Sequence, residues 1–230
     1  MCSSDLGYLA SAPAPAPRAV AAAGRGACAD LLRDLGLAAQ PAAPGASPAV
    51  GTLLVAGPGA VQPPDLAKAI EAGLDVVCLG LSGAELKAWC PAAIATVATN
   101  TTFARIAAPP PELDGLSNAD WAWHGRLSID ALQGTDASGN GALRVLRHGR
   151  GRIVIWQAPP WVIDEAAKPY LRTSKRHAFA MASRLLANLG AGFRTPLGER
   201  FAGPVPQAWL KSYYLDVPVA GDDPYRYYRW

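Results

Sequence analysis

The chain has 230 residues, of which 50% are hydrophobic and 17% charged, and its formal net charge at pH 7 is +3. This length suits one domain with appendages, and the apolar share is sufficient for a sizeable core. No apolar run approaches the roughly 18 residues that a membrane span needs, so we expect no span. The scattered basic residues lack the dense stripe with interleaved aromatic residues that is typical of nucleic-acid binding.

The N-terminal segment, residues 1–17, predicts a disordered or artefactual leader. It has no basic n-region and no sustained apolar stretch, so it does not resemble a secretory signal, and its Ala-Pro run at 13–17 is typical of extended spacers. The opening Met1-Cys2-Ser3-Ser4-Asp5-Leu6 looks like translated adapter sequence. We therefore expect the chain to be a fragment of a longer protein, and its compartment stays open.

Residues 18–88 predict alternating strands and helices. In chain order, we expect strand 18–23, helix 27–35, strand 52–56, helix 63–72, strand 75–80 and helix 84–88. Alternation at this spacing gives right-handed crossovers and a parallel sheet, because each helix returns the chain to the same edge. This half of the chain therefore predicts a flavodoxin-like or Rossmann-like layer.

The turn Gly24-Arg25-Gly26 invites a nucleotide-binding interpretation. Ala29 stands where the fingerprint G-x-G-x-x-G has its third glycine, which is a permitted variant. However, no acidic residue ends a second strand about twenty residues further on. A plain strand-to-helix turn is preferred, and a nucleotide-binding module with a phosphate cradle at residues 24–27 is an alternative.

The four cysteines do not indicate a metal site. Cys2, Cys28, Cys78 and Cys90 form no C-x-x-C pair, and no histidines stand beside them at the spacing of metal ligands. Cys78 lies within an apolar run, where a small buried thiol is the simplest interpretation. We expect no metal and no other cofactor.

Helical periodicity disappears between residues 90 and 116. Short strands are expected at 94–97 and 101–106, and a loop rich in aromatic and polar residues at 115–125. Such a loop can bind ligands. A loop held in place by its own tryptophans is the preferred alternative.

The strongest structural signal lies between residues 143 and 189. A β-hairpin is expected from 143–148 to 152–157, across the turn Gly149-Arg150-Gly151. Its second strand is apolar throughout, which fits a strand covered on both faces. An amphipathic helix then runs from near Pro169 to Leu189. Together these elements predict a three-layer α/β domain over residues 18–192, with a mostly parallel sheet and a late hairpin.

The C-terminal segment, residues 193–230, is expected to be an irregular, aromatic-rich extension. Residues 209–230 contain five tyrosines and two tryptophans. So many aromatic side chains are too costly to leave in water. We expect the extension to pack on the α/β body or on a domain that follows.

Several segments within residues 50–230 resemble a known family when they are taken in order. They are Gly115-Leu116-Ser117-Asn118-Ala119-Asp120, Gly149-Arg150-Gly151-Arg152-Ile153-Val154, Lys168-Pro169-Tyr170 and Arg184-Leu185-Leu186-Ala187-Asn188-Leu189-Gly190. They resemble the accessory domain of large bacterial β-galactosidase-like glycoside hydrolases, which has a class I glutamine-amidotransferase-like fold. The closing stretch 222–230 is similar to the linker that leads to a further β-rich domain in such proteins.

The resemblance implies a non-catalytic role in packing between domains or between subunits. The catalytic carboxylates of the parent enzyme would then lie in an upstream barrel outside this chain, and the partners would be neighbouring domains or other subunits. Carbohydrate is a further candidate partner, because aromatic faces suit the apolar faces of sugars. The candidate contacts are Trp121, Trp123, His124 and Trp161. Buried packing of these side chains is the alternative.

A competing hypothesis is a small hydrolase or an amidotransferase-like enzyme. Such an enzyme needs a nucleophile on a tight strand-to-helix elbow and a base within hydrogen-bond reach. Ser82 lies near the elbow position with His124 or His177 as the base, but Gly83 comes one place too early for G-x-S-x-G. The close carboxylate pairs occur in turns, where we expect solvation or capping: Glu112 with Asp114, Asp164 with Glu165, and Asp222 with Asp223. We therefore expect no catalytic residue.

Overall fold

The computed structural model describes residues 17–24, 26–43, 47–92, 94–106, 109–116, 118, 120–134 and 140–193. All of them fall within one compact unit, residues 16–202. Apart from Pro17 and Phe193, the expected leader and the expected C-terminal extension lie outside the described residues.

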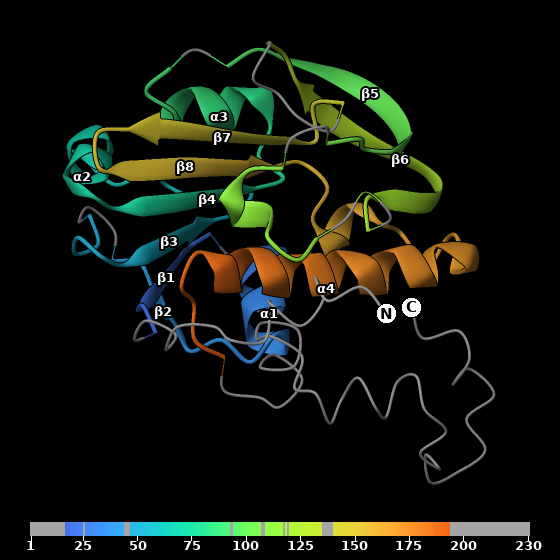
Figure 1. Cartoon of the computed structure of the whole chain (residues 1–230), viewed down its shortest axis with the longest axis horizontal. Coiled ribbons are helices and arrows are strands. Elements are labelled where there is room, and N and C mark those ends of the chain that lie inside the picture. The colour runs from blue at the N-terminus through green and yellow to red at the C-terminus, as the bar shows by residue number, and fades with distance from the viewer. Residues whose placement is uncertain are drawn as a thin grey trace, which may run out of the picture. The chain divides into compact units, whose positions relative to one another are not determined.

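A six-stranded sheet with strand order β2-β1-β3-β4-β8-β7 forms the centre of the fold (Figure 1). The strands are β1 (Val20–Ala23), β2 (Ala39–Pro41), β3 (Leu53–Ala56), β4 (Asp75–Leu79), β7 (Leu143–His148) and β8 (Gly151–Trp156). All neighbouring pairs are parallel except β7 with β8, which form the predicted antiparallel hairpin. The five parallel strands follow the order of flavodoxin-like sheets. The predicted α/β class with a mostly parallel sheet is therefore confirmed.

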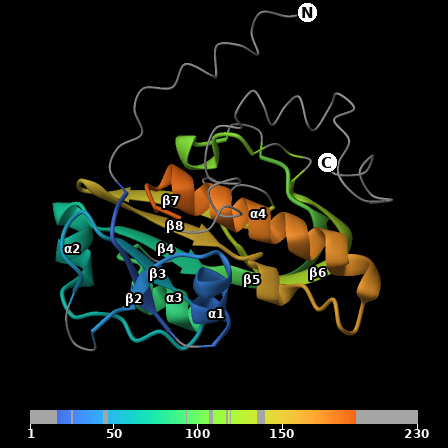
Figure 2. The same cartoon turned by 90° about the horizontal axis from the view of Figure 1, so that it is seen from below.

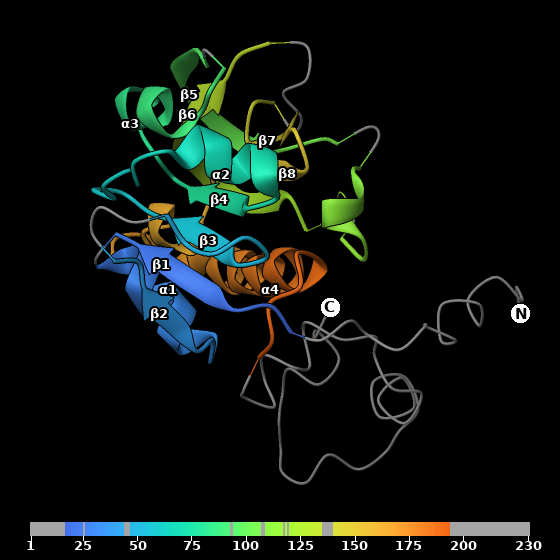
Figure 3. The same ribbon diagram turned by 90° about the vertical axis from the view of Figure 1, so that its left-hand side faces the viewer.

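Two helical layers cover the sheet, one on each face (Figures 2 and 3). The helices are α1 (Ala27–Asp34), α2 (Leu66–Ala72), α3 (Gly83–Trp89) and α4 (Arg172–Asn188). Side chains of a strand alternate between its faces. Leu53 and Val55 accordingly share a buried cluster with α1 and α4, whereas Leu54 and Ala56 share one with α2 and α3. The fold is thus a three-layer α/β arrangement.

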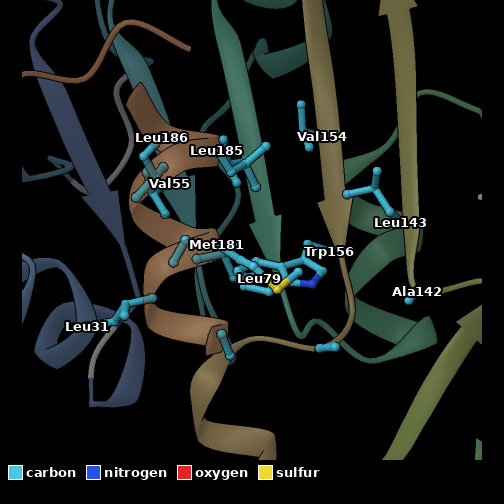
Figure 4. Packing of buried hydrophobic residues seen from close by; sticks show 14 of the residues in the cluster. Leu31, Val55, Leu79, Ala142, Leu143, Val154, Trp156, Met181, Leu185 and Leu186 are labelled. Carbon is cyan, nitrogen blue, oxygen red and sulfur yellow. The ribbon is translucent and has the colours of Figure 1, made fainter. Parts of the chain in front are cut away.

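The central strands are apolar because both of their faces are covered. All four residues of β3 are fully buried, and so are Ile153, Val154 and Ile155 of β8. The predicted helix near 169–189 is confirmed as α4, which follows a short 3-10 turn at Pro169–Leu171. Figure 4 shows Met181 of α4 beside Leu79 and Trp156 of the sheet. Burial of this kind is worth about 1.5–3 kcal/mol for each large apolar side chain.

A second, two-stranded antiparallel sheet corrects the prediction for the middle of the chain. It consists of β5 (Thr96–Phe103) and β6 (Ala122–Leu132). The two short strands expected at 94–97 and 101–106 are thus replaced by one strand. The loop expected at 115–125 ends where β6 begins, so Trp123 and His124 belong to a strand. The physical reason is an alternation of buried with exposed or half-buried side chains in β6, where Trp123, Leu127 and Ile129 face the core.

Candidate functional site

The carboxyl edge of the large sheet is the candidate site. Ligands of doubly wound sheets bind beyond the carboxyl ends of the strands, at the point where the strand order reverses. Here the order reverses between β1 and β3. The segments that follow the strands at this edge are 24–26, 57–59, 80–82 and 157–161.

Close packing fills the point of reversal between β1 and β3. A Cβ atom added to Gly24 would lie 3.2 Å from the carbonyl oxygen of Gly57. A Cβ atom added to Gly57 would lie 2.2 Å from Cβ of Cys28 on α1. These two loops and α1 are therefore in contact, and no side chain larger than hydrogen fits at Gly57 without a shift of its neighbours.

The Cys28 thiol in this contact is buried. Burial raises the pKa of Cys28 from 9.0 to about 11. The thiol therefore stays protonated at neutral pH, and a protonated thiol is neither a good nucleophile nor a metal ligand. Cys78 is fully buried in β4, as predicted, and a hydrogen bond with Cys90 together with burial raises its pKa. Within the described residues, no group of three or more His, Cys, Asp or Glu side chains is arranged to hold a metal ion.

A hollow of about 460 Å³ lies between α1 and the β1–β2 edge. Its lining residues are Ala22, Gly24, Ala29, Leu32, Arg33, Gly36, Leu37, Ala38, Ala39 and Pro41. The lining is mostly apolar, and the Arg33 guanidinium contacts Asp30 at 2.8 Å and Asp34 at 3.1 Å. A phosphate at this position would have to compete with two carboxylates for Arg33. The phosphate cradle proposed at 24–27 includes Arg25, which lies outside the described residues.

Ser82 is the N-cap of α3. Its backbone is extended, with φ −63° and ψ 160°, and its hydroxyl group donates a hydrogen bond of 2.7 Å to Oε2 of Glu85. The backbone N–H of Glu85 donates back to Oγ of Ser82 at 3.4 Å, which completes a capping box. The positive φ at this turn belongs to Gly80, at 60°. Ser82 therefore has the geometry of a helix cap and lacks the strained backbone of a nucleophile elbow.

Glu85 connects two loops of the candidate site. Its Oε1 accepts a hydrogen bond of 2.7 Å from the backbone N–H of Gly59, and its Oε2 accepts one of 2.8 Å from the N–H of Ser82. Desolvation acts to raise the pKa of Glu85, but the hydrogen bonds from Gly59 and Ser82 outweigh it and lower that pKa below 4.5. This role of Glu85 was not expected from the sequence, although the S-x-x-E spacing from Ser82 is typical of a capping box.

The two candidate bases lie on other elements. His124 is exposed on β6, and its backbone N–H donates a hydrogen bond of 2.8 Å to Oγ of Ser174 on α4. His177 is on α4, which covers the sheet face opposite to α3, and its buried Nδ1 has no hydrogen-bond partner in the described structure. Neither histidine forms a hydrogen bond with Ser82 in the described part of the chain. The structure therefore does not assemble the nucleophile and base of the competing enzyme hypothesis.

Two of the four candidate carbohydrate contacts are core residues. Trp121 is 2% exposed and Trp123 is 6% exposed. The Trp121 ring meets Trp156 edge to face, with centroids 6.2 Å apart and planes at 73°. These rings offer no free face to a sugar, in agreement with the packing alternative. Trp161 is half-buried beside Gly80 and His124 is exposed, so these two keep accessible surface.

A charge network at the opposite, amino edge of the sheet was not expected from sequence. The Asp75 carboxylate at the start of β4 accepts hydrogen bonds from Arg18 and Arg152. Oε1 of Glu112 accepts bonds of 2.7 Å from Arg147 and Arg152. The expectation that Glu112 is solvated or caps a turn is wrong, because its side chain is 0% exposed. Burial acts to lower the pKa of Arg152, but its two acidic partners raise it above its ordinary value.

Comparison with known proteins assigns no family. No protein-family profile matches the chain, and a comparison with curated proteins gives no significant match. The fold and the site define a class: a three-layer α/β domain with flavodoxin-like strand order, whose loops at the carboxyl edge pack on one another. None of the described helices is both long and apolar enough to cross a membrane.

Proposed function

We propose that this chain is a non-catalytic accessory domain of a carbohydrate-active glycoside hydrolase, where it packs between domains or subunits. The observation that carries the proposal is the role of Ser82 as a helix cap. Its hydroxyl group is directed to the Glu85 carboxylate, and both loops beside it are held by that carboxylate. A side chain in this position contributes to the stability of the fold.

The Glu85 carboxylate is a poor substitute for the missing base. A general base is most effective when its pKa lies near the working pH. Hydrogen bonds lower the pKa of Glu85 below 4.5, so at neutral pH it has little tendency to take the proton of Ser82. The Ser82–Glu85 pair therefore favours a structural function over nucleophilic catalysis.

The proposed glycosidase parent is supported by the resemblance of the loop, hairpin and helix segments. The segment 149–154 forms the turn between β7 and β8 and the start of β8, and the segment 184–190 spans the end of α4. The DNA on both sides of the reading frame tests this part of the proposal. An upstream glycosidase barrel in frame would support it. A natural start codon and stop codon that enclose only this small protein would contradict it.

Enzymatic assay of the 230-residue chain tests the non-catalytic role. We expect no turnover of glutamine, aryl esters or aryl glycosides, and no change in these rates in Ser82→Ala. Ser183→Ala is the control, because the Ser183 hydroxyl also donates a hydrogen bond within its own helix, to the backbone carbonyl of Phe179. Turnover that is lost in Ser82→Ala and kept in Ser183→Ala would show that Ser82 is a nucleophile and would refute the proposal.

A further inference from the structure

The outer edge of β5 is not paired with any strand of the described part of the chain. Strand β5 is eight residues long and pairs with β6, and no other described strand pairs with it. Figure 1 shows β5 at the border of the molecule, with β6 on its inner side. A two-stranded ribbon of this kind is only marginally stable by itself, so a further strand on its free edge would stabilise it.

The register of the ribbon identifies the backbone groups at this edge. The N–H of Gln133 donates a hydrogen bond of 2.9 Å to the carbonyl of Ala95, the residue before β5. In an antiparallel pair, hydrogen-bonded positions alternate along the strand. Val97 and Thr99 therefore bond to β6, whereas Ala98 and Asn100 direct their N–H and C=O groups outward. Both Ala98 and Asn100 are exposed.

The side chains of β5 do not prevent pairing with another strand. Natural edges are usually blocked by charged residues, proline or bulges that point outward. Strand β5 reads Thr-Val-Ala-Thr-Asn-Thr-Thr-Phe, with no charge and no proline, and Val97 and Phe103 are 49% and 53% exposed. Its register against β6 shifts only near its end, between Thr101 and Phe103, so the stretch from Thr96 to Thr101 is regular. The edge strand β7 of the large sheet carries Arg144, Arg147 and His148 instead. Strand β5 thus lacks both the charges of the edge strand β7 and the proline of the edge strand β2.

We propose that β5 pairs antiparallel with β5 of a second copy of this chain, so that two ribbons form one four-stranded sheet. A strand that pairs with itself around a two-fold axis places like residues opposite or near each other, and like charges there are destabilising. Because β5 is uncharged, every cross-strand pair is neutral in any register, and threonine faces threonine in several. This inference rests on the packing role proposed above, and it identifies the packing partner as a second copy of the chain.

A hollow at the start of β5 gives the exposed Phe103 a place to bind. Antiparallel pairing brings the end of one β5 to the start of the other. At that start, a hollow of about 640 Å³ is lined by Gly83, Ala84, Lys87, Ile94, Ala95 and Thr96. Apart from Lys87 and Thr96 this lining is apolar, so it suits an aromatic ring. The hollow of each copy would receive the Phe103 ring of the other copy. Phe103 is therefore the expected anchor on both sides of the symmetric interface.

Amide hydrogen exchange of the full chain, resolved by residue at low and high protein concentration, tests the pairing directly. We expect the amides of Ala98 and Asn100 to gain protection as the concentration rises, while those of Val97 and Thr99 are protected at all concentrations by β6. Sedimentation should show the mass of a dimer over the same range. Protection of Ala98 and Asn100 that does not change with concentration would mean that another segment of the same chain covers the edge, and would overturn the proposal.

The substitution Ala98→Lys provides the matched variant. Asp130 on β6 is opposite Ala98, so the new lysine has an acidic neighbour and the domain is expected to stay folded. Two copies of the lysine near the two-fold axis should weaken dimerisation at least about tenfold. Ser128→Lys, which adds the same charge to an exposed position of β6, should leave the dimer intact. A chain that stays monomeric at high concentration, or equal dimerisation of all three proteins, would refute the pairing but leave the non-catalytic role and the glycosidase parent untouched.

Discussion

The backbone N–H of Gly59 donates a 2.7 Å hydrogen bond to Oε1 of Glu85, which joins the loop after β3 to the first turn of α3. The other carboxylate oxygen of Glu85 completes the capping box with Ser82. One side chain thus connects two of the loops at which ligands of such sheets usually bind. The hydrogen-bonding groups of these loops at the carboxyl edge are therefore occupied by contacts within the chain.

Replacement of Glu85 by glutamine should destabilise the fold. The side-chain amide cannot keep all three charge-assisted hydrogen bonds from Gly59 and Ser82, and bonds of this type contribute about 1.5–3 kcal/mol each. Part of that is lost to solvent screening, because the group is only partly buried, so we expect a loss of about 1–2 kcal/mol in urea unfolding. Glu165→Gln, which removes a partly exposed ion pair with Lys175, is the control and should cost less than about 1 kcal/mol.

The contribution of Glu85 should also depend on pH with a defined sign. Its pKa in the folded protein is lowered below the ordinary 4.5, so folding favours the charged form. The stabilisation is therefore present above the unfolded pKa and is lost as the pH falls through the folded pKa. Unfolding free energies of the wild type and Glu85→Gln should differ at pH 7 and converge as the pH falls through the lowered pKa of the folded protein. A difference that grows as the pH falls would contradict this assignment.

The contribution of Cys28 to stability should be lost at high pH, whereas that of Glu85 is lost at low pH. Its pKa is raised from 9.0 to about 11 by burial, so folding favours the neutral thiol. This contribution is present below pH 9.0 and should be lost as the pH rises towards about 11, because the unfolded chain releases the proton first. Alkylation followed by mass spectrometry should find Cys28 unreactive at pH 7.5 in the folded protein and reactive in urea. Rapid modification of Cys28 in the folded chain would contradict its burial under Gly57.

The fold could be predicted from sequence where one continuous segment shows the apolar pattern of a buried strand or of an amphipathic helix. All of β3 and residues 153–156 of β8 are buried, and these apolar runs, together with the helical stripe of α4, predict the three layers. Strand β6 was missed because Ser128 and Asp130 alternate with its buried side chains and give the segment the composition of a loop. The composition of this segment suggested a loop, whereas the alternation of apolar and polar residues from Trp123 to Ala131 would have identified the strand.

The polar contacts at the two edges of the sheet were harder to predict, because several of them join residues that are distant in sequence, such as Gly59 and Glu85. Ser82 and Glu85 are three residues apart, and their spacing was a sufficient signal for a cap. Glu112, in contrast, meets Arg147 and Arg152, which are 35 and 40 residues further along the chain. Nothing local distinguishes Glu112 from a solvated carboxylate in a proline turn. Its burial follows from the register of β7 and β8, which only the tertiary structure provides.

Substitution of Trp121 and of Trp161, two of the candidate carbohydrate contacts, should lower the stability of the fold by different amounts. Trp121 lies in the core against Trp156, so Trp121→Ala should lower the free energy of unfolding by about 3–5 kcal/mol. Trp161 is half-buried, so Trp161→Ala should cost about half as much or less. If the domain contacts carbohydrate through this region, the weaker oligosaccharide binding should appear in Trp161→Ala, measured by calorimetry on folded protein. Equal costs for the two substitutions would contradict the burial difference.

The charge network around Glu112 gives the sharpest stability prediction. Its side chain is 0% exposed and accepts hydrogen bonds from Arg147, which is 60% exposed, and from Arg152, which is 22% exposed. Removal of the acid leaves the Arg152 guanidinium without one of its two acidic partners in a partly buried position, and a broken buried pair typically costs 3–5 kcal/mol. We expect about that loss for Glu112→Ala in chemical denaturation.

Arg147→Gln is the informative comparison for Glu112→Ala. Arg147 keeps most of its hydration in the folded protein, and Arg152 still neutralises the acid, so its loss should cost only about 0–1 kcal/mol. The asymmetry follows from burial, because the same carboxylate oxygen binds both guanidinium groups at 2.7 Å. If both substitutions were equally costly, the exposed ion pair would be worth as much as the buried one, and Glu112 would not act as the clamp that holds the 3-10 turn Pro111–Leu113 to β7 and β8.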